Sequence, residues 1–239
     1  MTIEDIADIQ KTPPKRRQLD KEGNMDLKKR IEQFKKVEYE TNKDFYREMT
    51  SGQQPHTLFI GCSDSRVHAE TLFQARAGEL FQIRNVANLV PRAEDADAHP
   101  SVVAAIKYAV KTLQVKTIMV CGHSNCGGCA AIRKQTEHME YLPYTRDWIS
   151  QSSFLSDQID NKYPDMKEED KLVMLEKLNA LRQLDNLMTY EFVRQRVESR
   201  KLKLQACYYD IGTGNISVYD FDEIPSGSID GVYKIADGN

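Results

Sequence analysis

Short apolar runs alternate with amphipathic stretches through the middle of the chain. Residues 56–61 (HTLFIG), residues 80–83 followed by 86–90, and residues 116–121 (KTIMVC) are apolar runs of strand length. After Pro100, apolar residues recur at helical spacing until the last of these runs begins. Strand and helix in alternation are typical of βαβ units, so we predict a mostly parallel sheet with helices on both faces.

The second half of the chain has a helical pattern that ends in a hairpin. Leucines recur at helical spacing from Leu172 to Leu187, and Phe192 and Val197 continue the helical pattern. Residues 203–209 then alternate in polarity, a GTGN turn follows at 212–215, and residues 216–219 return as a partner strand. The expected fold class is α/β, with a mostly parallel central sheet, about four parallel strands plus an antiparallel edge strand, flanking helices and an N-terminal helical arm.

The N-terminal region has its own pattern. Residues 1–23 are polar, which predicts a loosely ordered arm, and Asn24 or Asp26 is a candidate N-cap for a helix that follows. We expect this helical segment to pack against the core or against a partner subunit. Its apolar positions recur at helical spacing: Leu27, Ile31, Phe34, Phe45 and Met49.

Composition narrows the function classes. A formal net charge of −3 over 239 residues gives no indication of nucleic-acid or anionic-membrane binding. No apolar run approaches the roughly 20 residues that span a bilayer, and the first ten residues lack the apolar segment of a secretory peptide. Five cysteines in such a chain are typical of a reducing compartment, so we expect a cytoplasmic protein.

Two cysteine motifs follow predicted strands: CSDSR at 62–66 and CGHSNCGG at 121–128. Because parallel strands end at the same edge of a sheet, both motifs are expected where open α/β sheets bind ligands. Cys62, His123 and Cys126 would offer zinc two thiolates and an imidazole. Three protein ligands leave a fourth position open, which is the arrangement of a catalytic site.

Spacing alone leaves other interpretations open. Cys121 and Cys207 lie in apolar runs, where a cysteine is usually a small buried hydrophobe. Cys126 and Cys129 form a CxxC pair that is also typical of thiol oxidoreductases. Asp64 and Arg66 could be no more than a surface ion pair.

Three separated segments carry a resemblance that goes further. The segments CSDSRV, GELFQIRNVANLVP and YAVKTLQVKTIMVCGHSNCGG, in this order, are similar to the β-class carbonic anhydrases, and the match is dense over residues 53–131. The resemblance implies Cys62, His123 and Cys126 as ligands of one Zn²⁺ per subunit, and Asp64 with Arg66 as the catalytic pair. It further implies five residues that bind carbon dioxide: Gln53, Phe81, Val86, Tyr108 and Gly122.

The implied activity is the zinc-dependent, reversible hydration of carbon dioxide to bicarbonate and a proton by zinc-bound hydroxide, assisted by the Asp64–Arg66 dyad. In some relatives this aspartate closes the fourth zinc position. A regulated subgroup couples that closure to bicarbonate, but this chain has Phe59 where the subgroup has tryptophan, which puts such regulation in doubt.

The resemblance also implies a homodimer or homotetramer. We predict that residues 1–50 form a helical arm packing on a partner subunit and that residues 51–239 form the zinc-binding catalytic domain. Three alternatives remain: a carbon disulfide hydrolase on the same fold, a CxxC thiol oxidoreductase, and a zinc-stabilised binding module.

Overall fold

The computed structural model describes residues 26–134 and 141–221. Contacts within the chain divide it into two compact units, Met1–Gly52 and Gln53–Asn239. The arm predicted for residues 1–23 lies outside the described residues.

The first unit is helical, as its apolar periodicity predicts. Asp26 caps the first helix, since its carboxylate accepts a hydrogen bond from the Lys29 backbone N–H at 3.1 Å. Leu27, Ile31 and Phe34 are each about half exposed, so this stripe is not buried within the chain. The elements are α2 (Leu27–Gln33), a π-helical segment (Phe34–Tyr39), α3 (Lys43–Glu48) and a short 3₁₀ turn (Met49–Ser51).

The second unit is built on a five-stranded sheet with strand order β2-β1-β3-β4-β5. The first four strands in this order are parallel and β5 is antiparallel to β4, which confirms the predicted sheet. The strands are β1 (Thr57–Cys62), β2 (Leu80–Asn85), β3 (Thr117–His123), β4 (Lys203–Tyr209) and β5 (Ile216–Asp220).

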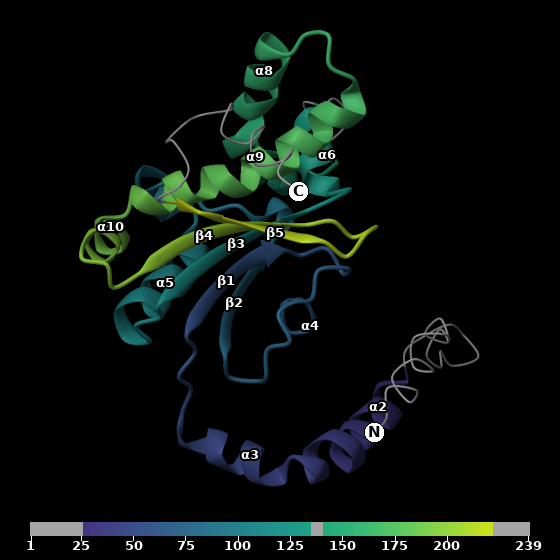
Figure 1. Cartoon of the computed structure of the whole chain (residues 1–239), viewed down its shortest axis with the longest axis vertical. Coiled ribbons are helices and arrows are strands. Elements are labelled where there is room, and N and C mark those ends of the chain that lie inside the picture. Colours follow the sequence, from purple (N-terminus) through teal and green to yellow (C-terminus); the bar gives the residue numbers. More distant parts are fainter. Residues whose placement is uncertain (1–25, 135–140, 222–239) are drawn as a thin grey trace. The chain divides into compact units, whose positions relative to one another are not determined.

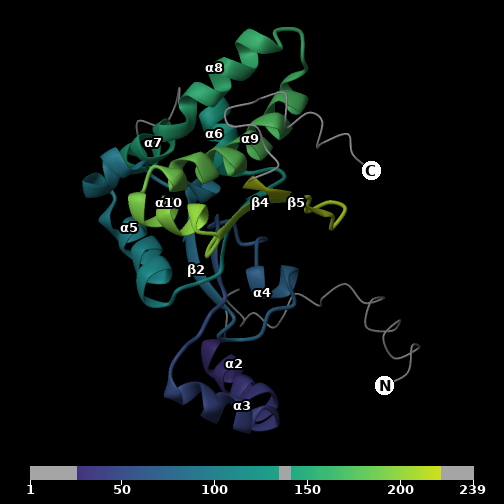
Figure 2. The ribbon, with the colours of Figure 1, turned by 60° about the vertical axis from the view of Figure 1, so that its left-hand side comes forward.

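Helices lie on both faces of the sheet, but coverage is unequal (Figures 1 and 2). The chain moves in one direction from β1 to β2 and in the other from β2 through β3 to β4, so right-handed crossovers place their helices on opposite faces. The first crossover contains only α4 (Ala69–Leu72), which joins a small cluster around Phe59, Cys121 and Cys207. The other face carries the main core with α5 (Pro100–Lys107), α6 (Gly127–Arg133), α7 (Pro143–Ile149), α8 (Ser153–Lys162), α9 (Glu168–Met188) and α10 (Glu191–Glu198).

The prediction that the strand continues through residues 86–90 is wrong. β2 ends at Asn85, and Ala87 and Asn88 adopt left-handed φ values of 62° and 50°, which an extended strand does not allow. The Asn85 side chain closes this turn by exchanging two hydrogen bonds with the backbone of Leu89, at 2.8 and 2.9 Å. The side chains of Ala87, Leu89 and Val90 are instead buried in a loop beside α9.

Shorter elements complete the second unit. They are 3₁₀ turns at Val86–Asn88, Ala93–Ala98 and Ser150–Ser152, and a π-helical continuation of α5 at Tyr108–Thr112. Within the part of the chain that the structure describes, no helix combines the length and the apolar character needed to cross a bilayer.

Candidate metal centre

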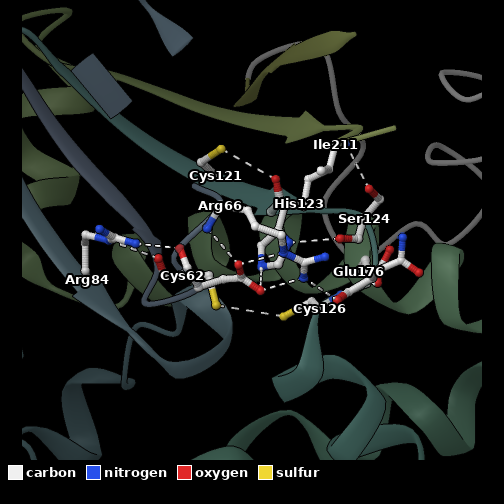
Figure 3. A network of polar contacts seen from close by, with 12 residues as sticks. Cys62, Arg66, Arg84, Cys121, His123, Ser124, Cys126, Glu176 and Ile211 are labelled. Atoms are coloured by element: carbon white, nitrogen blue, oxygen red, sulfur yellow. Dashed lines mark hydrogen bonds and ion pairs between the residues drawn. The ribbon is translucent and has the colours of Figure 1, made fainter. Parts of the chain in front are cut away.

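Neighbouring strand ends bring the three candidate ligands together. Cys62 is the last residue of β1, His123 is the last residue of the adjacent β3, and Cys126 immediately precedes α6. Their ligand atoms all lie within 4.8 Å of one another, and all three residues are buried. The two sulfur atoms are 3.9 Å apart (Figure 3). Tetrahedral zinc with Zn–S bonds of about 2.3 Å places two thiolates about 3.8 Å apart, so the donor set fits zinc.

The imidazole of His123 has the tautomer that a metal requires. Its Nδ1 donates a hydrogen bond to the Ser124 carbonyl at 3.0 Å, so the lone pair is left on Nε2. Nε2 is fully buried and has no hydrogen-bond partner among the described residues. An orphaned buried nitrogen beside two sulfur atoms fits a metal ligand better than a core histidine.

Without a metal, both thiols hold their protons firmly. A hydrogen bond with Cys126, together with burial, raises the pKa of Cys62 to about 12. A hydrogen bond with Cys129, again with burial, raises the pKa of Cys126 to about 12. Only a cation bound between them would make both thiolates stable at neutral pH.

Asp64 and Arg66 form a bidentate pair at the rim of this cluster. Arg66 Nε and Nη2 donate to the two carboxylate oxygens of Asp64 at 2.9 and 2.7 Å. These hydrogen bonds hold the pKa of the Asp64 carboxyl well below its usual range. Asp64 Oδ2 lies 4.0 Å from His123 Nε2, so the carboxylate faces the cluster while both its oxygens are bonded to Arg66.

Other polar side chains support the two motif loops. Arg84 donates to the backbone carbonyls of Cys62 and Asp64, at 3.1 and 2.6 Å, and thereby fixes the end of β1 (Figure 3). Ser124 Oγ accepts from the Ile211 backbone N–H at 2.9 Å, which ties the second motif to the chain beyond β4.

The five residues implied for the carbon dioxide pocket lie in different environments. The Phe81 and Tyr108 rings are in contact, with centroids 5.9 Å apart, and Tyr108 is 46% exposed. Val86 is half-buried and begins the turn after β2, whereas Gln53 is exposed at the start of the second unit. Gly122 is buried within β3, where a Cβ atom would lie 3.0 Å from the Glu176 carbonyl of α9.

Sequence reasoning did not identify Glu176 as part of the site. This carboxyl is 1% exposed and accepts hydrogen bonds from the Cys126 backbone N–H and the Tyr208 hydroxyl, both at 2.8 Å. Burial raises the pKa of Glu176 above its ordinary value. Its only signal in the sequence is a polar position within a leucine-rich helix, which solvent-facing residues share.

Comparison with known proteins decides the family. The sequence model of a family described as carbonic anhydrase matches residues 57–216. A carbonic anhydrase of Helicobacter pylori (strain J99) is 34% identical over 194 residues, which are 80% of this chain and 87% of that protein. The structure of the β-carbonic anhydrase CcaA superposes with a TM-score of 0.77 at 32% identity and covers 81% of this chain and 86% of that one.

The chain belongs to the β-carbonic anhydrase family. This result confirms the resemblance drawn from the three sequence segments and makes the protein an enzyme of the carbonic anhydrase class. A chain from the crystal structures of two tetrameric β-carbonic anhydrases of Sordaria macrospora is also similar, with a TM-score of 0.71, 27% identity, and coverage of 80% of this chain and 94% of that chain.

Proposed function

We propose that Cys62, His123 and Cys126 bind one Zn²⁺ per subunit and that the site catalyses the reversible hydration of carbon dioxide. The observation that carries this proposal is the buried cluster of two thiols and an imidazole whose unpartnered Nε2 faces the sulfur atoms. Bound zinc would supply a Lewis acid that acidifies a water molecule at the open fourth position.

Asp64 and Arg66 have separate tasks in this proposal. Asp64 accepts a hydrogen bond from the reacting water and holds it toward the substrate. Arg66 fixes the carboxylate by its bidentate contact and also donates to the Asn125 carbonyl at 3.0 Å, so the dyad is tied to the second motif. We propose that near and above neutral pH Asp64 remains hydrogen-bonded to Arg66 and does not bind the metal.

Carbon dioxide is apolar, and an apolar wall suits it. Phe81, Val86 and Tyr108 would form that wall, while the Gln53 amide would donate a hydrogen bond to a substrate oxygen. The exposed Tyr108 and Gln53 suggest a pocket that a second subunit completes.

A homo-oligomer with residues 1–50 as an arm on a neighbouring subunit is part of the proposal. The exposed apolar stripe of Leu27, Ile31, Phe34 and Val37 supports it, because an isolated chain leaves these side chains in water. The Sordaria macrospora relatives are described as tetrameric. All five cysteines are free thiols, which fits a reducing compartment such as the cytoplasm.

The test is stopped-flow hydration of carbon dioxide on protein whose zinc content has been measured, with carbon disulfide hydrolysis assayed in parallel. We expect stoichiometric zinc, hydration that chelation abolishes and zinc restores, and no comparable carbon disulfide turnover. Cys62→Ser should lose both zinc and activity, whereas Cys207→Ser, a matched change at another buried cysteine, should keep zinc. Full activity in Cys62→Ser would remove Cys62 from the metal site.

A further inference from the structure

Helix α9 buries a polar stripe against the site. Glu176, Asn179, Gln183 and Asn186 are spaced so that they share one face of the helix, and each is at most 6% exposed. A polar stripe on a long helix usually faces solvent. This one instead faces the loops that follow β2 and β3, so its side chains replace water as partners of those loops.

Three members of the stripe hold the loop after β2. Asn179 donates to the Ala87 carbonyl, Gln183 accepts from the Val90 N–H, and Asn186 donates to the Val90 carbonyl, each at 2.8 Å. Glu176 is the member directed at the loop after β3, which carries the candidate ligand Cys126.

The contact between Glu176 and that loop is short and doubly anchored. Glu176 Oε1 accepts the Cys126 backbone N–H at 2.8 Å (Figure 3). Glu176 Oε2 accepts the Tyr208 hydroxyl from β4, also at 2.8 Å. Gly122 makes this approach possible, since a Cβ atom there would lie 3.0 Å from the Glu176 carbonyl and 3.1 Å from Ala180 Cβ. The carboxyl is therefore held between β4 and the turn that carries Cys126.

The residues that precede Cys126 in this turn, Ser124 and Asn125, are held by other hydrogen bonds. The Ser124 N–H donates to the Tyr209 carbonyl at 3.0 Å, and Arg66 donates to the Asn125 carbonyl at 3.0 Å. Asn125 has a left-handed φ of 55°, a conformation that asparagine tolerates. Among the described contacts, Glu176 is the side chain that fixes the backbone N–H of Cys126 itself.

We propose that Glu176 is a positioning residue that sets the zinc affinity of the site by holding Cys126 in its ligating position. The inference rests on the proposed zinc site. Loss of the acceptor leaves a buried N–H without a partner, and the turn moves to satisfy it, taking the Cys126 sulfur with it. Loss of such outer contacts typically weakens metal binding by about 10- to 100-fold, which is the range expected here.

The test compares two neutral substitutions of similar size. Glu176→Gln keeps an oxygen that can accept the Cys126 N–H, whereas Glu176→Leu has none. Gln183→Leu is the matched control, because it removes the same kind of side-chain acceptor from the same face of α9 but frees the Val90 N–H instead. Zinc dissociation constants would be measured by competition with a chromophoric chelator, and site geometry by the visible absorption of the cobalt(II) forms.

We expect Glu176→Leu to weaken zinc binding about 10- to 100-fold and to shift the cobalt(II) bands, while Glu176→Gln and Gln183→Leu bind zinc as the wild type does. Equal affinity of wild type and Glu176→Leu would overturn the proposal, and so would equal losses in Glu176→Leu and Gln183→Leu. Wild-type protein that binds no zinc would instead refute the metal site itself.

Tyr208→Phe provides a second variant if Glu176→Leu does not fold. It removes one anchor of the carboxyl and leaves Glu176 in place. We expect about 3- to 10-fold weaker zinc binding, and an unchanged affinity in a folded Tyr208→Phe protein would count against the positioning role.

Discussion

At the scale of single residues, the site depends on which partner each polar atom has. His123 Nδ1 donates a hydrogen bond to a carbonyl, and Nε2 has no hydrogen-bond partner among the described residues, so one ring nitrogen is left for a metal. Both carboxylate oxygens of Asp64 accept hydrogen bonds from Arg66, so the carboxylate is oriented before any substrate binds. These details decide function, and the spacing of cysteine and histidine in the sequence cannot reveal them.

The Asp64–Arg66 pair leads to the first prediction. Asp64→Asn should retain stoichiometric zinc, because the three candidate ligands are untouched, but lower kcat/KM for hydration by about 100-fold or more. Zinc content and stopped-flow rates on the same sample provide the measurement. An unchanged rate would mean that the dyad has no catalytic part and that the pair is structural.

The raised thiol pKa values lead to a second prediction. Both Cys62 and Cys126 have pKa values of about 12 before metal binds, so zinc must displace one proton from each. Raising the pH makes that displacement easier, and the apparent zinc affinity should rise by up to about 100-fold per pH unit around neutrality. Competition with a chelator at several pH values measures this. A pH-independent affinity would contradict binding through two thiolates.

At the scale of elements, the strands were predictable and the loops between them were not. The apolar runs at 56–61 and 116–121 identified β1 and β3, because a buried parallel strand is apolar at nearly every position. The same reasoning failed at residues 86–90, where Ala87 and Asn88 adopt left-handed φ values and apolar side chains are buried in a loop. Glu176 was missed for a related reason, since the sequence does not distinguish an inward polar stripe from a solvated one.

A cluster of charged side chains joins α6, α8 and α9. Arg133 Nη2 and Lys171 Nζ contact Asp160 Oδ1 at 2.6 and 2.7 Å, and both cations are nearly buried. Asp160→Asn should lower the free energy of unfolding by about 1 kcal/mol at neutral pH, a small value because Asp160 is 40% exposed. Asp147→Asn, which breaks the exposed Arg146 pair, should cost much less.

The pH dependence of this effect has a definite sign. Hydrogen bonds from Arg133 and Lys171 hold the pKa of Asp160 well below its usual range, so its stabilisation is fully present above the unfolded-state pKa of about 3.9. It is lost as the pH falls through the folded-state value. Urea unfolding should therefore show a difference between wild type and Asp160→Asn that narrows in acid, and a difference that widens there would contradict the assignment.

At the scale of the whole molecule, the family and the directions of the strands could be predicted, whereas the strand order and the surface on which the N-terminal helices pack could not. Three motifs in register were enough to identify the family, because each occupies a strand end at one edge of the sheet. The side chains of Leu27, Ile31, Phe34 and Val37 are exposed in the single chain. In the sequence, a helix of this pattern looks the same whether it packs on its own core or on another subunit.

Removal of the arm tests that part of the proposal. Deleting residues 1–45 should lower the molecular mass of the assembly and the hydration rate together, because in the proposed assembly a second subunit completes the pocket. Ile31→Asp in the full chain should also lower the molecular mass of the assembly and the hydration rate, since it places a charge in the apolar stripe. Light scattering and stopped-flow kinetics measure both quantities, and a truncated protein with unchanged mass and rate would exclude the arm from the interface.

The central claim is that Cys62, His123 and Cys126 hold a zinc ion whose fourth position is open. The most direct measurement is a crystal structure at about pH 8.5 with anomalous diffraction recorded at the zinc edge. We predict one zinc peak per subunit, bonded to both sulfur atoms and to His123 Nε2, with solvent at the fourth position and Asp64 on Arg66. A cluster without zinc, or a fourth position closed by Asp64 or Cys129 at that pH, would contradict the account.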